Sequence, residues 1–312
     1  MTDNRSAPAV VALMGPTAAG KTDASLGIAD AAVVDLISVD SAMVYRKMDI
    51  GTAKPTAEVL ARYPHALVDI RDPVDTYSAA HFVADADEAV RCSLDAGRTP
   101  VLVGGTMLYF RAFKAGLHRL PGADPALRHE LAARAARLGW PALHGELARR
   151  DPEGAARIDP YNGQRIQRAL EVLELTGRPL GFWWSRTAQS AQQRLGCRLV
   201  EVAIEPADRS SLHQRIASRL DEMLRRGLVD EVGALRDDPA LSIETPAMRA
   251  VGYRQVWRHL DGDYGHDAMV ERIRAATRQI AKRQLTWIRG WDGLAGMAVD
   301  APTAVGVVLQ NL

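Results

Sequence analysis

Short apolar runs that end in polar or turn residues recur along the first third of the chain. Each run has the length and composition of a buried strand, and the runs cover residues 10–14, 33–39, 66–70 and 101–103. Helical patterns separate them, for example at residues 22–32 and 79–96. This alternation predicts a parallel sheet with helices on both faces.

The strand pattern disappears near Pro121 and returns at residues 198–204. Between these points the chain is rich in Ala, Leu and Arg, with leucines at helical spacing and prolines that break the helices. We therefore expect an α/β domain formed by residues 1–120 and 198–312, interrupted by an all-helical insertion at 121–197. Helices are expected to continue after residue 204 to about residue 291.

Composition excludes several classes of protein. Of 312 residues, 47% are hydrophobic and 25% charged, which is typical of a globular protein and not of a disordered or collagen-like chain. No uncharged apolar run reaches the roughly 18 residues of a membrane span, and the apolar stretch at 8–15 leads into a motif, not a signal-peptide cleavage site. The two cysteines have no metal-type spacing, so we expect a cytoplasmic protein.

The net charge of +1 hides an uneven distribution. Residues 119–198 carry +5 and residues 271–289 carry +5, while the rest of the chain is acidic. This asymmetry is typical of a localised surface for a polyanion, although two solvated helical faces would look the same in the sequence.

A phosphate-binding loop is the most specific motif. Residues 15–22 match GxxxxGK[ST] between a predicted strand and a predicted helix, and they are Gly15, Pro16, Thr17, Ala18, Ala19, Gly20, Lys21 and Thr22. Backbone N–H groups and the helix N-terminus would bind a polyphosphate, Lys21 would add a charge, and the Thr22 hydroxyl would ligate Mg²⁺. A chance glycine-rich turn is the alternative.

Polar side chains follow two further predicted strands. Asp40 ends the second strand, at the carboxyl edge where ligands bind in such sheets, and it could serve as a general base or as the N-cap of the next segment. Thr106 ends the fourth and could bind substrate or cap the following helix. Asp69 is the nearest candidate for a metal-shell carboxylate, on a weak signal.

Two predicted helices carry ordered arginines. Arg215 and Arg219 border the apolar face of the helix at about 208–226, where they could reach a cleft or cover the core with their stems. Arg274, Arg278, Lys282 and Arg289 form one stripe on a later helix. Such a stripe suits a phosphate backbone, and a solvated face is the alternative.

Taken together, the motifs closely resemble the tRNA dimethylallyltransferase (tRNA isopentenyltransferase) family in its bacterial form. The matching stretches follow the family's order over nearly the whole chain, and the most discriminating are DSAMVY at 40–45, GGTMLY at 104–109 and KRQLTWIR at 282–289. The zinc finger of eukaryotic relatives has no counterpart here, because the chain has no cysteine pairs.

The resemblance implies a P-loop NTPase-like parallel sheet and transfer of a dimethylallyl group from dimethylallyl diphosphate to the N6 amine of the adenosine immediately 3′ of the anticodon. It implies catalytic roles for Asp40, Thr106, Lys21 and Arg215, diphosphate binding by residues 15–22 with Arg215 and Arg219, and Mg²⁺ as cofactor at Thr22.

The same resemblance implies contacts with the tRNA anticodon stem-loop from both the core and the insertion. The implied contact residues are Asp40, Ser41, Ala42, Met43, Thr106, Arg128, Gln164, Arg165, Ile166, Gln167, Arg168, Arg249, Gly252, Tyr253, Arg254, Arg278, Lys282, Arg283 and Arg289. We expect a monomer with no membrane partner.

Two rival functions use parts of the same sequence. A small-molecule kinase would use the loop for ATP but would not need two basic blocks outside the cleft. A non-catalytic RNA-binding module would use those blocks but would not need the loop and Asp40.

Overall fold

The computed structural model describes residues 7–117, 120–184 and 188–312. It divides into two compact units, a larger one of Met1–Ala115 with Ser190–Leu312 and a smaller one of Gly116–Gln189. The sequence pattern places the corresponding boundaries at 121 and 197. Along the described chain, no helix has the length and apolar character needed to cross a membrane.

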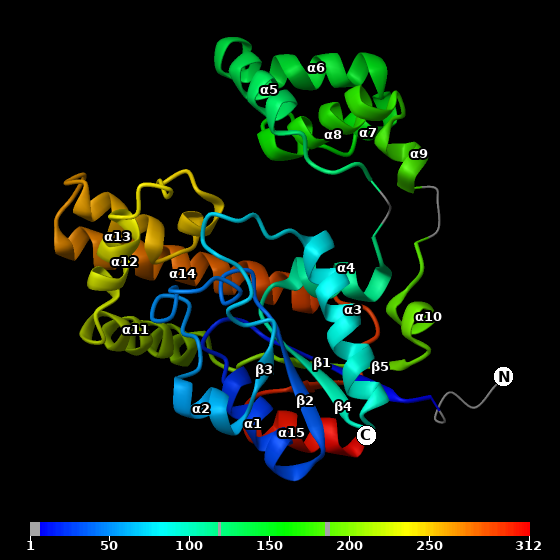
Figure 1. Cartoon of the computed structure of the whole chain (residues 1–312), viewed down its shortest axis with the longest axis vertical. Helices are drawn as coiled ribbons and strands as arrows, with labels where there is room; N and C mark the ends of the chain where they lie inside the picture. The colour runs from blue at the N-terminus through cyan, green and yellow to red at the C-terminus, as the bar shows by residue number, and fades with distance from the viewer. Residues whose placement is uncertain (1–6, 118–119, 185–187) are drawn as a thin grey trace. The chain divides into compact units, whose positions relative to one another are not determined.

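A six-stranded, all-parallel sheet is the centre of the larger unit (Figure 1). Its strands lie in the order β3-β2-β4-β1-β5-β6, with bounds β1 Ala9–Met14, β2 Val34–Val39, β3 His65–Ala66, β4 Thr99–Gly104, β5 Arg198–Ile204 and β6 Gly296–Ala298. β1 is flanked by β4 and β5, so the strand that precedes the phosphate-binding motif is central. The parallel sheet predicted from the sequence is confirmed.

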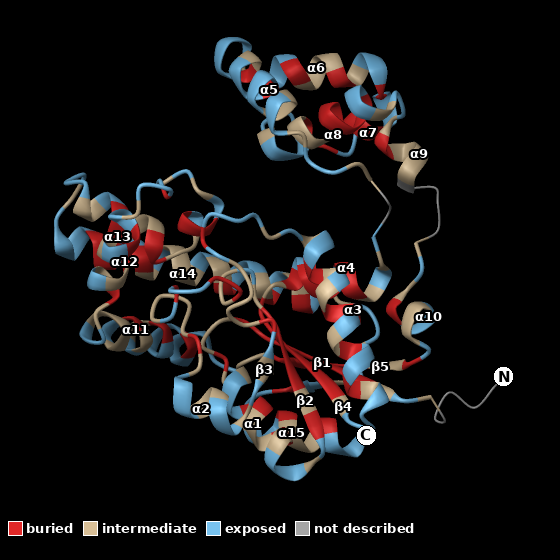
Figure 2. Ribbon diagram, in the orientation of Figure 1, coloured by how far each residue is buried: buried red, intermediate tan, exposed pale blue. Residues whose placement is uncertain are grey.

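Alternate residues of each strand pack on opposite faces of the sheet, and helices cover both faces. Val10, Ala12 and Met14 of β1 join a core with α3 (Ala79–Asp95) and α4 (Met107–Ala115). Val11 and Leu13 join a second core with α1 (Lys21–Ala31) and α15 (Ala301–Gln310). Figure 2 shows these strands as the most continuously buried part of the larger unit.

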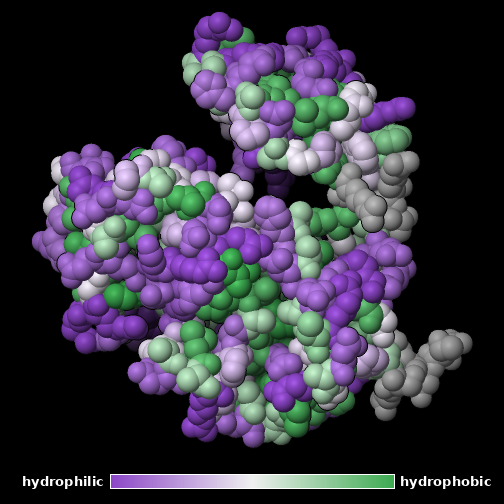
Figure 3. Space-filling view, in the orientation of Figure 1, coloured by the Kyte–Doolittle hydropathy of each residue, from purple (hydrophilic) through white to green (hydrophobic). Residues whose placement is uncertain are grey.

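A helical lobe with its own core completes the larger unit. It contains α11 Arg209–Arg225, α12 Leu228–Arg236, a short 3₁₀ helix Pro246–Arg249, α13 Tyr253–Leu260 and α14 His266–Arg289. Val44, Tyr45 and Met48, from the loop after β2, pack among these helices. On the face shown in Figure 3, hydrophilic side chains dominate the surface over α11, α12 and α13. The remaining helices of the unit are α2 Ala57–Arg62 and α10 Ala191–Leu195.

The smaller unit is all-helical in its described residues. Its helices are α5 Pro125–Leu138, α6 Trp140–Arg150, α7 Pro152–Ala155, α8 Gly163–Thr176 and α9 Leu180–Trp184. Leu131, Leu143, Leu147 and Leu170 fill its core. Glu171 is completely buried, and it accepts hydrogen bonds from Arg128, from Arg168 and from the backbone N–H of Asp124.

Two predicted features of the larger unit differ from the structure. The apolar run 66–70 is not a strand, because Leu67 and Asp69 have φ angles of 65° and 56°, and β3 ends at Ala66. After residue 291, where no element was predicted, the chain forms β6 and α15. Asp300 caps α15 and a proline occupies its first turn, so a helix-start signal is present in the sequence there.

Candidate active site

The phosphate-binding loop connects β1 to α1 at the carboxyl edge of the sheet. Ala18 and Gly20 have φ angles of 60° and 92°, which turn the backbone so that α1 begins at Lys21. The Lys21 ammonium donates a hydrogen bond of 2.6 Å to the Pro16 carbonyl. The predicted motif therefore has the strand–loop–helix context that its chemistry requires.

Two adjoining cavities open at this edge of the sheet. The first, of about 380 Å³, is lined by the phosphate-binding loop from Thr17 to Thr22, by Arg215, and by Gly104 and Gly105 at the end of β4. The second, of about 370 Å³, is lined by residues of the helical lobe that are largely apolar, among them Ile216, Leu220, Met223, Leu228, Val251, Ile273 and Ile280. Five residues line both cavities, and they are Thr17, Asp40, Thr52, Arg219 and Gln284.

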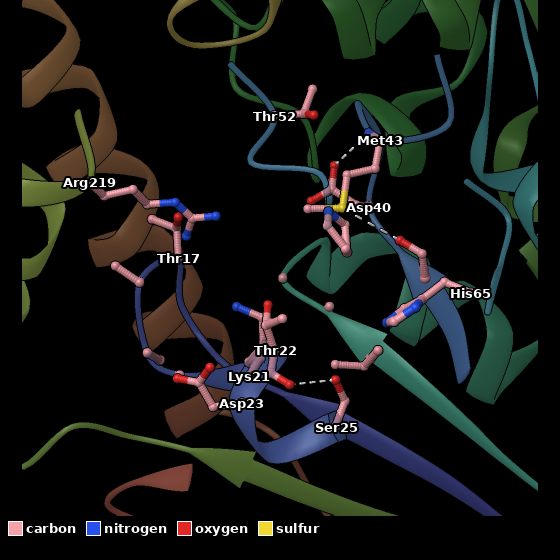
Figure 4. A pocket seen from close by; sticks show the side chains of 18 of the residues that line it. Thr17, Lys21, Thr22, Asp23, Ser25, Asp40, Met43, Thr52, His65 and Arg219 are labelled. Atoms are coloured by element: carbon pink, nitrogen blue, oxygen red, sulfur yellow. Dashed lines mark hydrogen bonds between the residues drawn. The ribbon is translucent and has the colours of Figure 1, made fainter. Parts of the chain in front are cut away.

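Electrostatics in the first cavity favour an anion. Figure 4 shows Arg219 and Asp40 on opposite walls, with Lys21 and Thr22 between them. Burial and the nearby charge of Arg219 lower the pKa of Lys21 to about 7, with Asp40 acting in the opposite direction. Burial also lowers the pKa of Arg219. Two cations held this close in a desolvated cavity gain from a bound polyphosphate.

Asp40 lies directly after β2, and its Oδ1 atom accepts hydrogen bonds from the backbone N–H groups of Ala42 (2.8 Å) and Met43 (3.2 Å). These bonds stabilise a turn at 41–43. No helix directly follows Asp40 in the described chain, so the side chain caps a turn and is not the N-cap of a helix. Among described residues, the Oδ2 atom has no hydrogen-bond partner. One carboxylate oxygen thus fixes the side chain while the other remains available to a ligand.

Thr106 lies after β4 and faces the Asp40 turn. Its hydroxyl accepts a 3.2 Å hydrogen bond from the backbone N–H of Ser41. The start of α4 is instead held by the Thr106 carbonyl, which accepts from the N–H groups of Tyr109 and Phe110. The Thr106 side chain therefore connects the ends of β2 and β4 and does not cap the helix.

Asp69 is not placed to bind a metal at the cavities. Its Oδ1 atom lies 2.6 Å from the ammonium of Lys54, a side chain that is only 3% exposed, and Asp69 lines neither cavity. The structure thus corrects the metal-shell alternative. The described residues contain no cluster of three or more His, Cys, Asp or Glu side chains able to hold a metal. Thr22 lines the first cavity, and one hydroxyl with substrate oxygens and waters is a donor set that Mg²⁺ accepts.

Gln284 is a site residue that the sequence analysis missed. Its Oε1 accepts from the backbone N–H of Thr17 (2.9 Å), and its Nε2 donates to the carbonyl of Gly105 (2.8 Å). It thereby connects α14 to the phosphate-binding loop and to the end of β4. Its partners are backbone groups 267 and 179 residues away, so local spacing assigns it no role, although it lies within the stretch KRQLTWIR at 282–289 that carries the family resemblance.

The basic stripe on α14 divides into paired and unpaired residues. Arg274 pairs with Asp221 and Glu271, and Arg289 pairs with Glu205. Arg278, Lys282 and Arg283 have no ion pair among the residues that the structure describes, and Arg283 lines the second cavity. The middle of the stripe, Arg278 and Lys282, and the adjacent Arg283 are therefore not neutralised by a described carboxylate and can bind a polyanion.

Other candidate tRNA contacts are distributed over several environments. Ser41, Ala42, Arg249 and Gly252 line the second cavity, where Arg249 also pairs with Glu244, and Met43 lines the first. Arg254 lines a separate pocket with Arg258 and Arg272.

In the smaller unit, Gln164 and Arg165 are exposed, whereas Arg128 and Arg168 are occupied by Glu171, and Gln167 donates to the carbonyl of Arg128. Ile166 and Tyr253 are fully buried, in the smaller and the larger unit respectively. A fully buried side chain cannot contact RNA, so these two side chains are removed from the candidate tRNA contacts.

Comparison with known proteins gives a consistent result. Residues 43–291 match the family model described as IPP transferase. The chain is 56% identical over 287 residues to a tRNA dimethylallyltransferase of Alkalilimnicola ehrlichii, covering 92% of this chain and 89% of the relative. It is 49% identical over 320 residues to tRNA dimethylallyltransferase 2 of Hahella chejuensis, covering 99% and 96%.

A solved structure, the tRNA isopentenylpyrophosphate transferase of Bacillus halodurans, is similar with a TM-score of 0.67 and 35% identity over 97% of both chains. These matches show that the chain belongs to the IPP transferase family, whose curated members carry the name tRNA dimethylallyltransferase.

Proposed function

We propose that the chain transfers a dimethylallyl group from dimethylallyl diphosphate to the N6 amine of the adenosine immediately 3′ of the tRNA anticodon, releasing diphosphate. The observation that carries this proposal is the position of Asp40, which lines both an anion-binding cavity and an adjoining, largely apolar one. A diphosphate ester in the first cavity and a base in the second would meet at this carboxylate.

The acceptor amine needs a base. Its lone pair is delocalised into the adenine ring, so its proton must leave as the new bond forms. In the proposed step N6 attacks C1 of the dimethylallyl group, the C1–O bond to diphosphate breaks, and Asp40 accepts the N6 proton. The bonds from Ala42 and Met43 leave Oδ2 for this transfer. Thr106, which lines the second cavity, would orient the base.

The departing diphosphate gains negative charge, and the first cavity would stabilise it. Loop N–H groups, Lys21, Arg215 and Arg219 are the donors placed there. Mg²⁺, held by the Thr22 hydroxyl and diphosphate oxygens, would supply further charge stabilisation. In this way a phosphate-binding loop serves the breaking of a C–O bond instead of a P–O bond.

The RNA would bind through cations that have no ion pair among the described residues. These are Arg278, Lys282 and Arg283 on α14 and Arg165 on α8, where the exposed amide of Gln164 would add a neutral polar contact. We propose that the larger unit catalyses transfer, that the smaller unit contacts tRNA, and that the protein acts as a cytoplasmic monomer. The acceptor adenosine would leave the loop stack to enter the cavity, as in other base-modifying enzymes.

One assay separates this proposal from a small-molecule kinase and from a non-catalytic RNA-binding module. The protein is incubated with Mg²⁺, unmodified tRNA, and either labelled dimethylallyl diphosphate or γ-labelled ATP. Transfer of the prenyl label to RNA, at the adenosine 3′ of the anticodon, is the expected result. Transfer of phosphate to any acceptor, or RNA binding without transfer of either label, would contradict it.

A further inference from the structure

The loop at 49–53 forms part of the wall of the second cavity. Gly51, Thr52 and Ala53 line this cavity, and Thr52 also lines the first. Ala53 has a φ angle of 56°, a left-handed conformation that is strained for a residue other than glycine. Such a backbone persists only where its surroundings hold it in place.

A carboxylate of the helical lobe accepts hydrogen bonds from the backbone of this loop. The Oε2 atom of Glu231, on α12, accepts hydrogen bonds from the backbone N–H groups of Asp49 (3.0 Å) and Ile50 (2.7 Å). Its Oε1 atom accepts from the N–H of Gly51 (3.1 Å) and from the Tyr253 hydroxyl (2.5 Å). Both oxygens are therefore occupied by donors, and Glu231 itself lines neither cavity.

The fourth donor brings in a second part of the cavity wall. Tyr253 is fully buried and directly follows Val251 and Gly252, which line the second cavity. Its ring packs so closely against Gly51 that a Cβ atom there would lie 2.5 Å from Cε2. Burial and the charge of Glu231 raise the pKa of Tyr253, so the phenol keeps its proton and donates it.

Lys54 holds the other end of the same loop. Its ammonium donates to the Tyr45 carbonyl (2.9 Å) and pairs with Asp49 and Asp69. This network anchors the loop to the segment that follows β2. Of these two networks, the one centred on Glu231 reaches the wall formed by Val251 and Gly252, through Tyr253.

Building on the proposed function, we propose that Glu231 is a positioning residue for the acceptor base. By tying loop 49–51 to Tyr253, its carboxylate sets the separation of two walls of the cavity that receives the adenosine. It acts through the backbone of the loop and through the Tyr253 hydroxyl, and it touches neither substrate.

The substitution Glu231→Gln tests this positioning role, because the side chain keeps nearly the same size and shape. The amide replaces one acceptor oxygen with a donor, so at least one backbone N–H of the loop loses its acceptor on either orientation of the amide. Tyr253→Phe removes only the hydroxyl and keeps the ring beneath Gly51. Glu222→Gln is the matched control, because Glu222 is on the neighbouring α11 and, among the residues that the structure describes, its carboxylate pairs only with Arg225 at the surface.

The primary readout is insertion of the base, measured with an anticodon stem-loop RNA that carries 2-aminopurine at the acceptor position. Unstacking of 2-aminopurine into the wild-type cavity should raise its fluorescence. We expect Glu231→Gln to lose most of this rise and to slow single-turnover transfer to unmodified RNA roughly tenfold at saturating substrates. Tyr253→Phe should move both readouts in the same direction by less, and Glu222→Gln should match wild type.

Affinity for dimethylallyl diphosphate distinguishes positioning from general loosening. It should stay within about twofold of wild type in all three variants. The inference is wrong if both Glu231→Gln and Tyr253→Phe keep the wild-type fluorescence rise and transfer rate. It is also wrong if affinity for dimethylallyl diphosphate falls as much as the transfer rate does. If Glu231→Gln does not fold, the result for Tyr253→Phe decides. Wild-type protein that does not prenylate the RNA would overturn the proposed function itself, which is a distinct result.

Discussion

At the scale of single residues, the site assigns two tasks to the same side chain. Oδ1 of Asp40 stabilises the turn at 41–43, while Oδ2 is left for chemistry. The capping and general-base alternatives drawn from the sequence are therefore compatible with each other. Lys21 likewise combines a structural bond to Pro16 with a charge that the cavity makes unusually easy to lose.

The pKa of Lys21 predicts a pH dependence of donor binding. With a pKa of about 7 in the free protein, Lys21 loses its charge as pH rises through 7, whereas a bound diphosphate would favour the ammonium form. Binding above pH 7 should therefore take up a proton, and affinity should fall by up to about tenfold per pH unit. Calorimetric titration with dimethylallyl diphosphate and Mg²⁺, in buffers of different ionisation enthalpy, measures this uptake.

Lys21→Arg is the control, since a guanidinium stays charged over this range and reports the ligand's own proton changes. If the wild-type protein takes up no more protons on donor binding at pH 8 than Lys21→Arg does, Lys21 is already fully charged in the free protein.

The position of a site residue was predictable from the sequence where the residue directly follows a predicted strand. The loop 15–22 and Asp40 directly follow strands, so the topology alone brings them to one edge. The roles of Gln284 and Glu231 were not predictable, even though Gln284 lies in the motif at 282–289, because their partners are mainly backbone groups distant in the sequence. The side chains of Ile166 and Tyr253 are buried and cannot contact RNA, which a motif could not reveal because it does not report which of its side chains point inward.

At the scale of secondary-structure elements, α14 would link the two proposed substrate sites, since its Gln284 lines both cavities. Gln284 contacts the phosphate-binding loop and Gly105, while Arg278, Lys282 and Arg283 keep unpaired charges in the described structure. One helix would thus couple the position of the diphosphate to the surface that holds RNA.

Gln284 variants test the contact between α14 and the loop. Gln284→Ala removes both hydrogen bonds and should weaken donor binding by about tenfold, because the Thr17 N–H and the Gly105 carbonyl lose their partners. Gln284→Glu still accepts from Thr17, but it adds a negative charge beside the diphosphate and should bind donor more weakly than the Ala variant. Equilibrium binding of labelled donor gives the order, and a Glu variant that binds as well as Ala would contradict the assignment.

The stripe on α14 makes a separate prediction about salt. Arg278→Gln with Lys282→Gln should weaken tRNA binding and reduce the slope of log affinity against log salt by about 2, since each phosphate contact contributes roughly one unit. The control pair, Arg274→Gln with Arg289→Gln, removes charges that protein carboxylates already neutralise and should change the slope little. Equal slopes in the two double variants would identify the whole stripe as a solvated face.

Strands were predictable from the sequence where a run of apolar residues also has an extended backbone. The strands at β1, β2, β4 and β5 satisfy this condition, whereas the run at 66–70 has the composition of a strand and a backbone that is left-handed at Leu67 and Asp69. The Asp69–Lys54 ion pair, a tertiary contact that no local pattern reports, lies within this segment. β6 was missed because it has only three residues.

At the scale of the whole molecule, the chain consists of two compact units. The larger unit contains both cavities, and the smaller one has a separate core organised around the buried Glu171. The uneven charge along the sequence predicts a basic surface on each of the two units. It does not reveal that Glu171 occupies Arg128 and Arg168, which reduces the charge that the smaller unit can offer to RNA.

The proposed reaction depends most on Asp40 as the base that accepts the N6 proton. Asp40→Asn keeps an oxygen for the Ala42 and Met43 N–H groups, so the turn and the thermal stability should be preserved, whereas Asp40→Ala should cost about 1 kcal/mol. The amide cannot take a proton as the carboxylate does, which predicts a fall in rate of about 10²–10⁴ with little change in donor or tRNA affinity.

Single-turnover transfer by Asp40→Asn, with labelled dimethylallyl diphosphate and tRNA both saturating, is the most direct measurement of this claim. We predict a rate at least about a hundredfold below wild type in a protein that melts normally and binds both substrates. A near-normal rate in that variant would remove Asp40 from the chemistry and leave it as the residue that shapes the turn.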